Sequence, residues 1–145
     1  MNTLEQTNIE LVKTFISAFW NGNDAGLAET LLADDYVDHA YVPHTAEGLK
    51  QMAAQLRSAF PDQQSAIQEI VAQGDKVIVR LKLQGTHGGD FRGNPATGRP
   101  VDVAIYREYR LADGKIAEHW ALFDTAALFI QIGAQLTPDQ ACKIR

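Results

Sequence analysis

Two stretches in the second half of the chain alternate between apolar and polar residues, and this alternation limits the possible folds most strongly. In "KVIVRLKLQ" the odd-numbered positions from Val77 to Leu83 are all apolar, whereas the even-numbered ones include arginine, lysine and glutamine. In "VDVAIYREYRL" the odd-numbered positions from Val101 to Leu111 are again the more apolar set. A period of two is typical of strands that bury one face of a sheet. We therefore expect an antiparallel sheet whose odd-numbered side chains point into the core.

Apolar residues elsewhere repeat every three or four positions, which is typical of amphipathic helices. One such segment covers residues 7–20. A second, short one follows Asp24, and a third follows Thr45 and stops before Pro61. Aspartate and threonine are favoured helix caps, and proline ends a helix that precedes it. Three helices are therefore expected before the sheet.

Aromatic and β-branched residues in "DDYVDHAYV", residues 34–42, predict a short strand that carries Asp38. Gly74 and Asp75 predict a turn between two later strands. Residues 88–100, "GGDFRGNPATGRP", are rich in glycine and proline and predict a loop that covers the mouth of a pocket. With its helices and its sheet in separate parts of the sequence, the chain belongs to the α+β class, as one domain over residues 1–145.

The composition argues against several classes of partner. The chain has 145 residues, of which 46% are hydrophobic, and a net charge of -5. Nucleic acids and anionic membranes are bound by clustered lysine and arginine, which this acidic chain does not offer. The N-terminus carries acids and amides where a signal peptide would be basic and then apolar, and no apolar run has the length of a membrane span. We expect a cytoplasmic protein that binds a small molecule.

Arg107 shares the inward parity of its strand, and a guanidinium on an apolar face is costly unless an acceptor meets it. Asp38 is the candidate partner. The parity of the last strand, residues 115–123, depends on the turn in "ADGK". A two-residue Asp-Gly turn pairs odd with even positions, whereas a type I turn with a left-handed bulge at Gly114 pairs odd with odd. We favour the bulged form, because Gly114 then lies where a positive φ is needed, and His119 consequently faces inward.

These choices gather a few polar side chains among apolar ones on the inner face of the sheet. The residues expected to transfer protons or hold a ligand oxygen are Asp38, His119 and Arg107. The residues expected to line the pocket are Phe15, Phe19, Tyr36, Phe60, His87, Tyr109, Ala121 and Phe123. A concave apolar site with converging polar groups is the usual form of a small-molecule pocket.

Two interpretations of the polar cluster remain open. Asp38 and His119 could remove a proton next to a carbonyl group while Arg107 or Tyr109 stabilises the enolate. Alternatively, the cluster is an internal ion pair that only joins the sheet to the first strand, since structural networks also perturb pKa values. The four histidines lack the spacing of metal ligands, so we expect no metal.

Asp124 lies where the last strand meets a helix expected over residues 125–132 and ended by Gly133. Either a catalytic carboxylate or a helix cap fits this position. Because aspartate is strongly preferred as an N-cap, we favour the cap.

Four motifs together resemble the SnoaL-like polyketide cyclase, or ester cyclase, family. They are "FPD" at 60–62, "GDKVIVR" at 74–80, "GTHGGDFRGNPATGRPV" at 85–101 and "DGKIAEHWALFDTAALFIQIG" at 113–133. The resemblance implies the cone-shaped α+β fold of the nuclear transport factor two superfamily, in which helices cover a curved sheet. It also implies ring closure by an intramolecular aldol reaction without a metal or cofactor, and a homodimer formed through the sheet. The residues expected on the outer face, Trp120, Leu122 and Tyr106, are more apolar than an exposed sheet normally shows and suit such a dimer.

The resemblance can be carried over position by position. The catalytic aspartate of the polyketide cyclases falls at Ala121 of this chain. A pocket histidine of those cyclases falls at the position that Arg107 occupies in this chain. A neighbouring glutamine falls at Ile105, and an asparagine of the first strand falls at Asp38. Two functions are therefore expected as alternatives: a cofactor-independent cyclase or isomerase that acts on a small apolar carbonyl compound, or a protein of the same fold that binds a small hydrophobic ligand without reaction.

Overall fold

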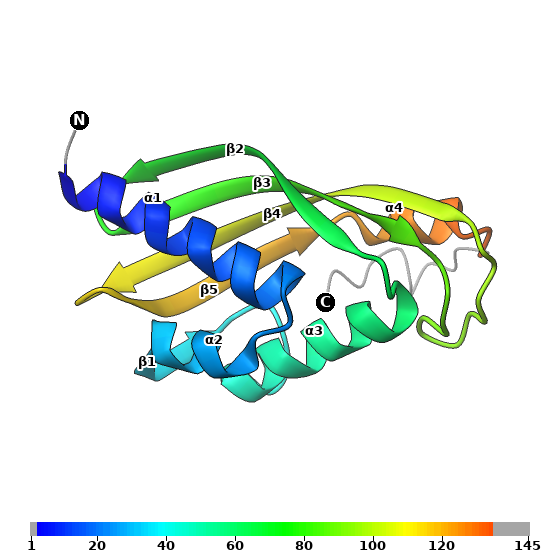
Figure 1. Cartoon of the computed structure of the whole chain (residues 1–145), viewed down its shortest axis with the longest axis horizontal. Helices are drawn as coiled ribbons and strands as arrows, with labels where there is room; N and C mark the ends of the chain where they lie inside the picture. Colours follow the sequence, from blue (N-terminus) through cyan, green and yellow to red (C-terminus); the bar gives the residue numbers. More distant parts are fainter. Residues whose placement is uncertain (1–2, 135–145) are drawn as a thin grey trace.

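Five strands form one sheet in the order β1-β5-β4-β3-β2, in a computed structural model that describes residues 3–134 (Figure 1). The strands are Leu32–Asp38 (β1), Gln64–Gln73 (β2), Lys76–Thr86 (β3), Pro100–Ala112 (β4) and Lys115–Phe123 (β5). β1 pairs with β5 in parallel, and the other neighbours are antiparallel. The parallel pair is important for the site, because it brings the end of β1 beside the middle of β5.

The helices are Thr3–Phe15 (α1), Ala25–Leu31 (α2), Ala46–Ala59 (α3) and Thr125–Gln131 (α4). α1 continues directly into a π-helix, Ile16–Asn21 (η1), so the single helix expected over residues 7–20 starts earlier and ends with a wider turn. The predicted caps are confirmed, since Asp24 and Thr45 accept hydrogen bonds from the backbone N–H of Leu27 and Glu47. Together the helices and the sheet confirm the α+β prediction.

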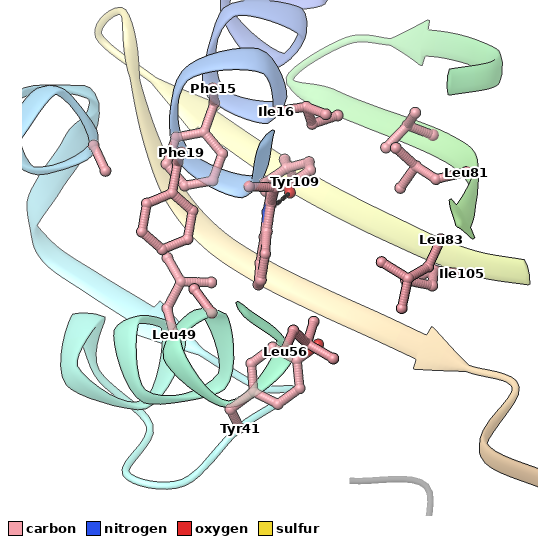
Figure 2. Packing of buried hydrophobic residues seen from close by; sticks show 14 of the residues in the cluster. Phe15, Ile16, Phe19, Tyr41, Leu49, Leu56, Leu81, Leu83, Ile105 and Tyr109 are labelled. Atoms are coloured by element: carbon pink, nitrogen blue, oxygen red, sulfur yellow. Dashed lines mark hydrogen bonds between the residues drawn. The ribbon is translucent and has the colours of Figure 1, made fainter. Parts of the chain in front are cut away.

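The inward parity of β3 and β4 is also confirmed. Val77, Val79, Leu81 and Leu83 are fully buried, and so are Ile105 and Tyr109 on β4. Figure 2 shows how Phe15 and Phe19 from the N-terminal helices, Leu49 and Leu56 from α3, and Tyr109 from the sheet gather into one cluster. The space between the helices and the sheet is thus filled by apolar side chains around a few polar ones.

The turn between β4 and β5 differs from the one favoured above. Asp113 and Gly114 both have positive φ, at 51° and 75°, and Ala112 pairs directly with Lys115, which makes a two-residue turn. The bulge instead lies within β5, where Ala117 is an extra residue between the pairs Leu111–Ile116 and Arg110–Glu118. This extra residue restores the odd-with-odd register. The predicted inward parity of the last strand is therefore right, and the predicted turn is wrong.

Helix length bears on membrane insertion. Within residues 3–134, no helix is long and apolar enough to cross a membrane.

Candidate active site

The centre of the site is a contact between the last residue of β1 and the middle of β5. The parallel pairing of these strands sets Asp38 opposite His119. His119 Nδ1 lies 3.2 Å from Asp38 Oδ2, and both side chains are fully buried, with 0% exposure. The sequence prediction that these two residues meet inside the sheet is confirmed.

Arg107 extends this contact to a third strand. On β4 it pairs with Ala121 of β5, two residues beyond His119. Arg107 Nη1 lies 3.3 Å from His119 Nε2 and donates a hydrogen bond to the Tyr41 hydroxyl at 3.0 Å. Within residues 3–134, Asp38 and Arg107 form no direct hydrogen bond or ion pair, so the prediction that they pair is wrong. The imidazole of His119 lies between the two side chains and contacts both. The result is a linear chain of polar groups that runs from Asp38 through His119 and Arg107 to Tyr41.

The geometry of this chain fixes the tautomer of His119. A guanidinium has no acceptor, so His119 Nε2 must accept from Arg107 and Nδ1 must carry the proton donated to Asp38. Burial lowers the pKa of His119, and the Arg107 charge lowers it further, against the opposing effect of the Asp38 carboxylate. The imidazole is consequently neutral around pH 7, as a general base must be.

Asp38 is held as a carboxylate by four donors. Its Oδ1 accepts from the backbone N–H of Ala40 at 2.8 Å and of Tyr41 at 3.0 Å, and its Oδ2 accepts from the Tyr36 hydroxyl at 2.7 Å as well as from His119. Burial raises the pKa of Asp38, but the hydrogen bonds from His119 and Tyr36 outweigh it and leave the pKa below its usual value. Asp38 is therefore suited to orient and stabilise a protonated His119.

The Arg107 guanidinium lies in an aromatic setting. Its central carbon lies 3.9 Å from the centroid of the Trp20 ring, a cation–π arrangement, and only 1% of the residue is exposed. Trp20 Nε1 donates to the Tyr109 hydroxyl at 3.3 Å, and burial raises the pKa of Tyr109 to about 12. Nε and Nη2 of Arg107 are buried and have no hydrogen-bond partner among the described residues. Two donors on a buried cation therefore have the capacity to bind an anionic oxygen.

The other predicted pocket residues fall into two groups. Tyr36 and Tyr109 belong to the polar chain and its surroundings, and Phe15 packs edge-on against Tyr109 with ring centroids 5.9 Å apart. His87 lies apart, because its Nδ1 contacts the Thr97 hydroxyl at 3.0 Å and its ring packs against Phe60. Strand parity predicted that His87 lies in the pocket. However, His87 follows the end of β3 and belongs to the loop after it.

Two hollows share Tyr41 as a lining residue. An open groove of about 320 Å³ is lined by residues of α3, the segment before it and the loop after β3: Tyr41, Val42, Gly48, Gln51, Met52, Gln55 and Arg92. A much smaller inner cavity, of about 10 Å³, is lined by Tyr41, Met52, Leu56, Phe91, Arg92, Phe123 and Thr125. Of the pocket residues predicted from the sequence, Phe123 is the one that lines the inner cavity.

Sequence reasoning missed Trp20 and Tyr41. Trp20 follows the apolar spacing of the predicted first helix, but that spacing indicates burial and not a contact with Arg107. Tyr41 was expected within a strand over residues 34–42, on the face opposite to Asp38, whereas β1 ends at Asp38 and leaves Tyr41 in the following segment. Asp124 has the predicted capping role, because its carboxylate accepts from the backbone N–H of Ala127 at 3.1 Å. Within residues 3–134, no group of three or more His, Cys, Asp or Glu side chains is placed to hold a metal ion.

A helix-covered mixed sheet with a buried polar chain on its inner face defines an α+β protein of the cone-shaped type. Residues 10–132 match the family model described as SnoaL-like polyketide cyclase. The chain belongs to this family. The predicted family and fold are thereby confirmed.

The chain is similar both to named cyclases and to solved structures. Aklanonic acid methyl ester cyclase DnrD of Streptomyces peucetius is 31% identical over 134 residues, which cover 88% of this chain and 91% of the relative. The structure of wild-type IdmH of Streptomyces antibioticus, a proposed polyketide cyclase, has 30% identity and a TM-score of 0.78, with 88% of this chain and 99% of IdmH covered. A SnoaL-like protein from Jannaschia sp. CCS1 has a TM-score of 0.83 at 23% identity, with 94% of this chain and 98% of that protein covered, and so shows the fold.

Proposed function

We propose that the protein is a cofactor-independent cyclase or isomerase that acts by acid–base chemistry on a small, largely apolar carbonyl compound. The observation that carries this proposal is the coupling of three groups in one buried chain. A carboxylate orients a neutral imidazole, and the imidazole touches a guanidinium that has two nitrogens without a hydrogen-bond partner within residues 3–134. A base next to a preorganised oxyanion donor is what enolisation requires.

The proposed reaction begins with proton removal. His119 Nε2 takes a proton from the carbon next to the carbonyl, the C–H electron pair forms the C=C bond, and the carbonyl π pair moves to the oxygen. Arg107 binds that oxygen, and Asp38 stabilises the imidazolium. Because Nε2 accepts from Arg107 in the structure, the base becomes free when the ligand oxygen takes over the guanidinium donor.

Cyclisation follows if the same molecule carries a second carbonyl group. The enolate carbon attacks the second carbonyl carbon, a C–C bond forms, and the resulting alkoxide takes the proton back from His119. The product is an isomer of the substrate, so atoms and electrons balance without a co-reactant. Since Ala121 stands where the resemblance places the cyclase carboxylate, His119 replaces it as the base in this scheme.

The substrate class follows from the relatives. DnrD and DauD, the latter from Streptomyces sp. strain C5 and also 31% identical, are named as cyclases of aklanonic acid methyl ester. We propose a polyketide-type ester of this kind. Aromatic and apolar residues around the polar chain suit such a ligand.

The test is conversion of aklanonic acid methyl ester, followed by liquid chromatography of the isomeric product. His119→Ala and Arg107→Met should each lower the rate by at least about a hundredfold, the typical contribution of a general base or an oxyanion donor. Glu118→Gln, next to His119 but on the outer face, is the matched control and should keep the wild-type rate. Equal rates in the His119 and Glu118 variants would refute the scheme.

The alternative function is ligand binding without reaction. The replacement at Ala121, which removes the carboxylate that the resemblance places there, favours this alternative. In that case a polyketide-type ester would raise the melting temperature, since a ligand that binds only the native state stabilises it, but chromatography would recover it unchanged.

A further inference from the structure

The structure restricts how a ligand can reach the polar chain. Asp38 and His119 are fully buried, and every polar atom of their side chains already has a partner inside the protein. At the other end of the chain, Tyr41 is also buried, but it lines both the surface groove and the inner cavity. Contact with a ligand is therefore most direct at the Tyr41 end.

Tyr41 lines both hollows and also contacts the Arg107 guanidinium. The groove and the cavity share the lining residues Tyr41, Met52 and Arg92. Of these three, Tyr41 accepts the hydrogen bond from Arg107 Nη1, at 3.0 Å. Figure 2 places its ring beside Leu56 of α3, another wall of the inner cavity.

The direction of that hydrogen bond matters. Arg107 can only donate, so the Tyr41 oxygen accepts and its own hydroxyl hydrogen remains to be donated elsewhere. A phenol that accepts from a cation is a stronger donor toward a developing negative charge, because hydrogen bonds in a chain polarise one another. The position of Tyr41 is also fixed, since its backbone N–H binds Asp38 at 3.0 Å.

We propose that Tyr41 is the catalytic residue that donates a hydrogen bond to the ligand oxygen, and that the ligand enters from the groove past Met52 and Arg92. This inference rests on the proposed function, because it names a second group of the same site, besides Arg107, that binds the oxygen of the reacting carbonyl. The inner cavity has about the volume of a single water molecule, so Met52 and Arg92, which line both hollows, must move apart for a ligand to pass from the groove to the cavity side of Tyr41. Gln51, Gln55 and Arg92 would then contact oxygen substituents on the part of the ligand left in the groove.

The probe is 2-naphthol, whose ionised oxygen resembles an enolate and whose fluorescence reports binding. Tyr41→Phe keeps the ring and removes the donor. We expect the dissociation constant to rise between about tenfold and a hundredfold, as for a lost hydrogen bond to a charged group. Tyr106→Phe removes a phenol on the outer face, where the residue is 49% exposed, and should leave the dissociation constant unchanged.

The route is tested by a second variant, Met52→Trp, which fills the passage between the groove and the cavity. In stopped-flow measurements its association rate constant should fall at least tenfold, while its melting temperature stays near that of the wild type. Equal naphthol affinity in wild type and Tyr41→Phe, no saturable binding to the wild type, or an unchanged association rate in Met52→Trp would overturn the proposal.

Turnover separates this inference from the proposed function. If Tyr41→Phe converts the ester at the wild-type rate, Tyr41 is not the donor, although the cyclase function stands. If Tyr41→Phe loses naphthol affinity but the wild type converts no ester, the donor site is supported and the cyclase function is contradicted.

Discussion

His119 is the residue whose protonation couples the site to the stability of the fold. Its pKa is lowered by burial, whereas the unfolded chain has a histidine pKa near 6.5. The neutral form thus stabilises the native state fully above about pH 6.5, and this contribution is lost as the pH falls toward the folded pKa. We expect the free energy of unfolding to decrease between pH 6.5 and 5, by at most about 1.4 kcal/mol per pH unit from this residue.

Urea denaturation at pH 7.5, 6.5 and 5.5 measures this dependence. His119→Gln keeps a side chain that can donate to Asp38 and removes the titration, so its stability should change less over the same range. A variant with the full wild-type slope would show that other groups cause the acid sensitivity. The Asp38 carboxylate, with its lowered pKa, adds a separate loss only at much lower pH, below about 4.

Arg107 illustrates how a functional group can be costly for the fold. It is buried, and two of its nitrogens have no hydrogen-bond partner in the part of the chain that the structure describes. Replacing a buried charge by an apolar side chain of similar volume is often neutral or stabilising. Arg107→Met should therefore change the free energy of unfolding by no more than about 1 kcal/mol, or raise it, while activity is lost. Asp38→Ala, which leaves three buried donors and one partly buried donor without their acceptor, should cost about 3 kcal/mol or more. Denaturant unfolding of both variants at pH 7.5 distinguishes these outcomes, and a larger loss in Arg107→Met would contradict this account of the cluster.

At the scale of elements, the β4–β5 hairpin sets which side chains enter the site. Gly114 has a φ of 75°, and a Cβ there would meet no atom within 4 Å, so backbone conformation alone opposes a side chain. Gly114→Ala should lower the free energy of unfolding by about 1 kcal/mol. Gly26→Ala in α2 is the matched control, because a Cβ there makes ordinary contact and alanine favours a helix, so stability should stay the same or rise. Thermal unfolding that ranks these two variants in the opposite order would contradict the turn assignment.

The same hairpin shows what the sequence could and could not predict. The alternation along β3 and β4 predicted their inner faces, because a strand with one buried face needs a period of two. The Ala117 bulge was not readable, since Ile116 and Ala117 are both apolar and fit either a regular or a bulged strand. Tyr41 was missed because the strand predicted over residues 34–42 ends at Asp38, and Trp20 because helical spacing predicts burial but not which polar group a side chain contacts. Parity thus predicted the sheet side of the site, and the remaining side depends on tertiary packing.

At the scale of the whole molecule, the outer face of the sheet has exposed apolar residues in its centre. Leu122 is 57% exposed and Tyr106 is 49% exposed, on neighbouring strands where they pair directly, and Ile78 and Val71 extend the patch toward β2. Apolar patches of this kind often mark protein–protein contacts. We propose a homodimer formed through this face.

Light scattering at micromolar concentration measures the assembly. The wild type should have the mass of two chains, and a Tyr106→Lys, Leu122→Lys double variant should have the mass of one, because paired like charges on both surfaces repel. Tyr106→Phe, which keeps the apolar surface, should remain dimeric. A monomeric wild type would contradict the homodimer proposal without affecting the buried site.

The central claim is that the buried chain of Asp38, His119 and Arg107 performs acid–base chemistry on a carbonyl compound. Deuterium exchange tests it most directly: 2-tetralone is incubated with the protein in deuterated water, and loss of its protons next to the carbonyl is followed by NMR. The account predicts exchange at least about a hundredfold faster than in buffer, returning to the buffer rate in an Asp38→Asn, His119→Gln double variant. Exchange in the double variant as fast as in the wild type, or no acceleration by the wild type, would contradict it.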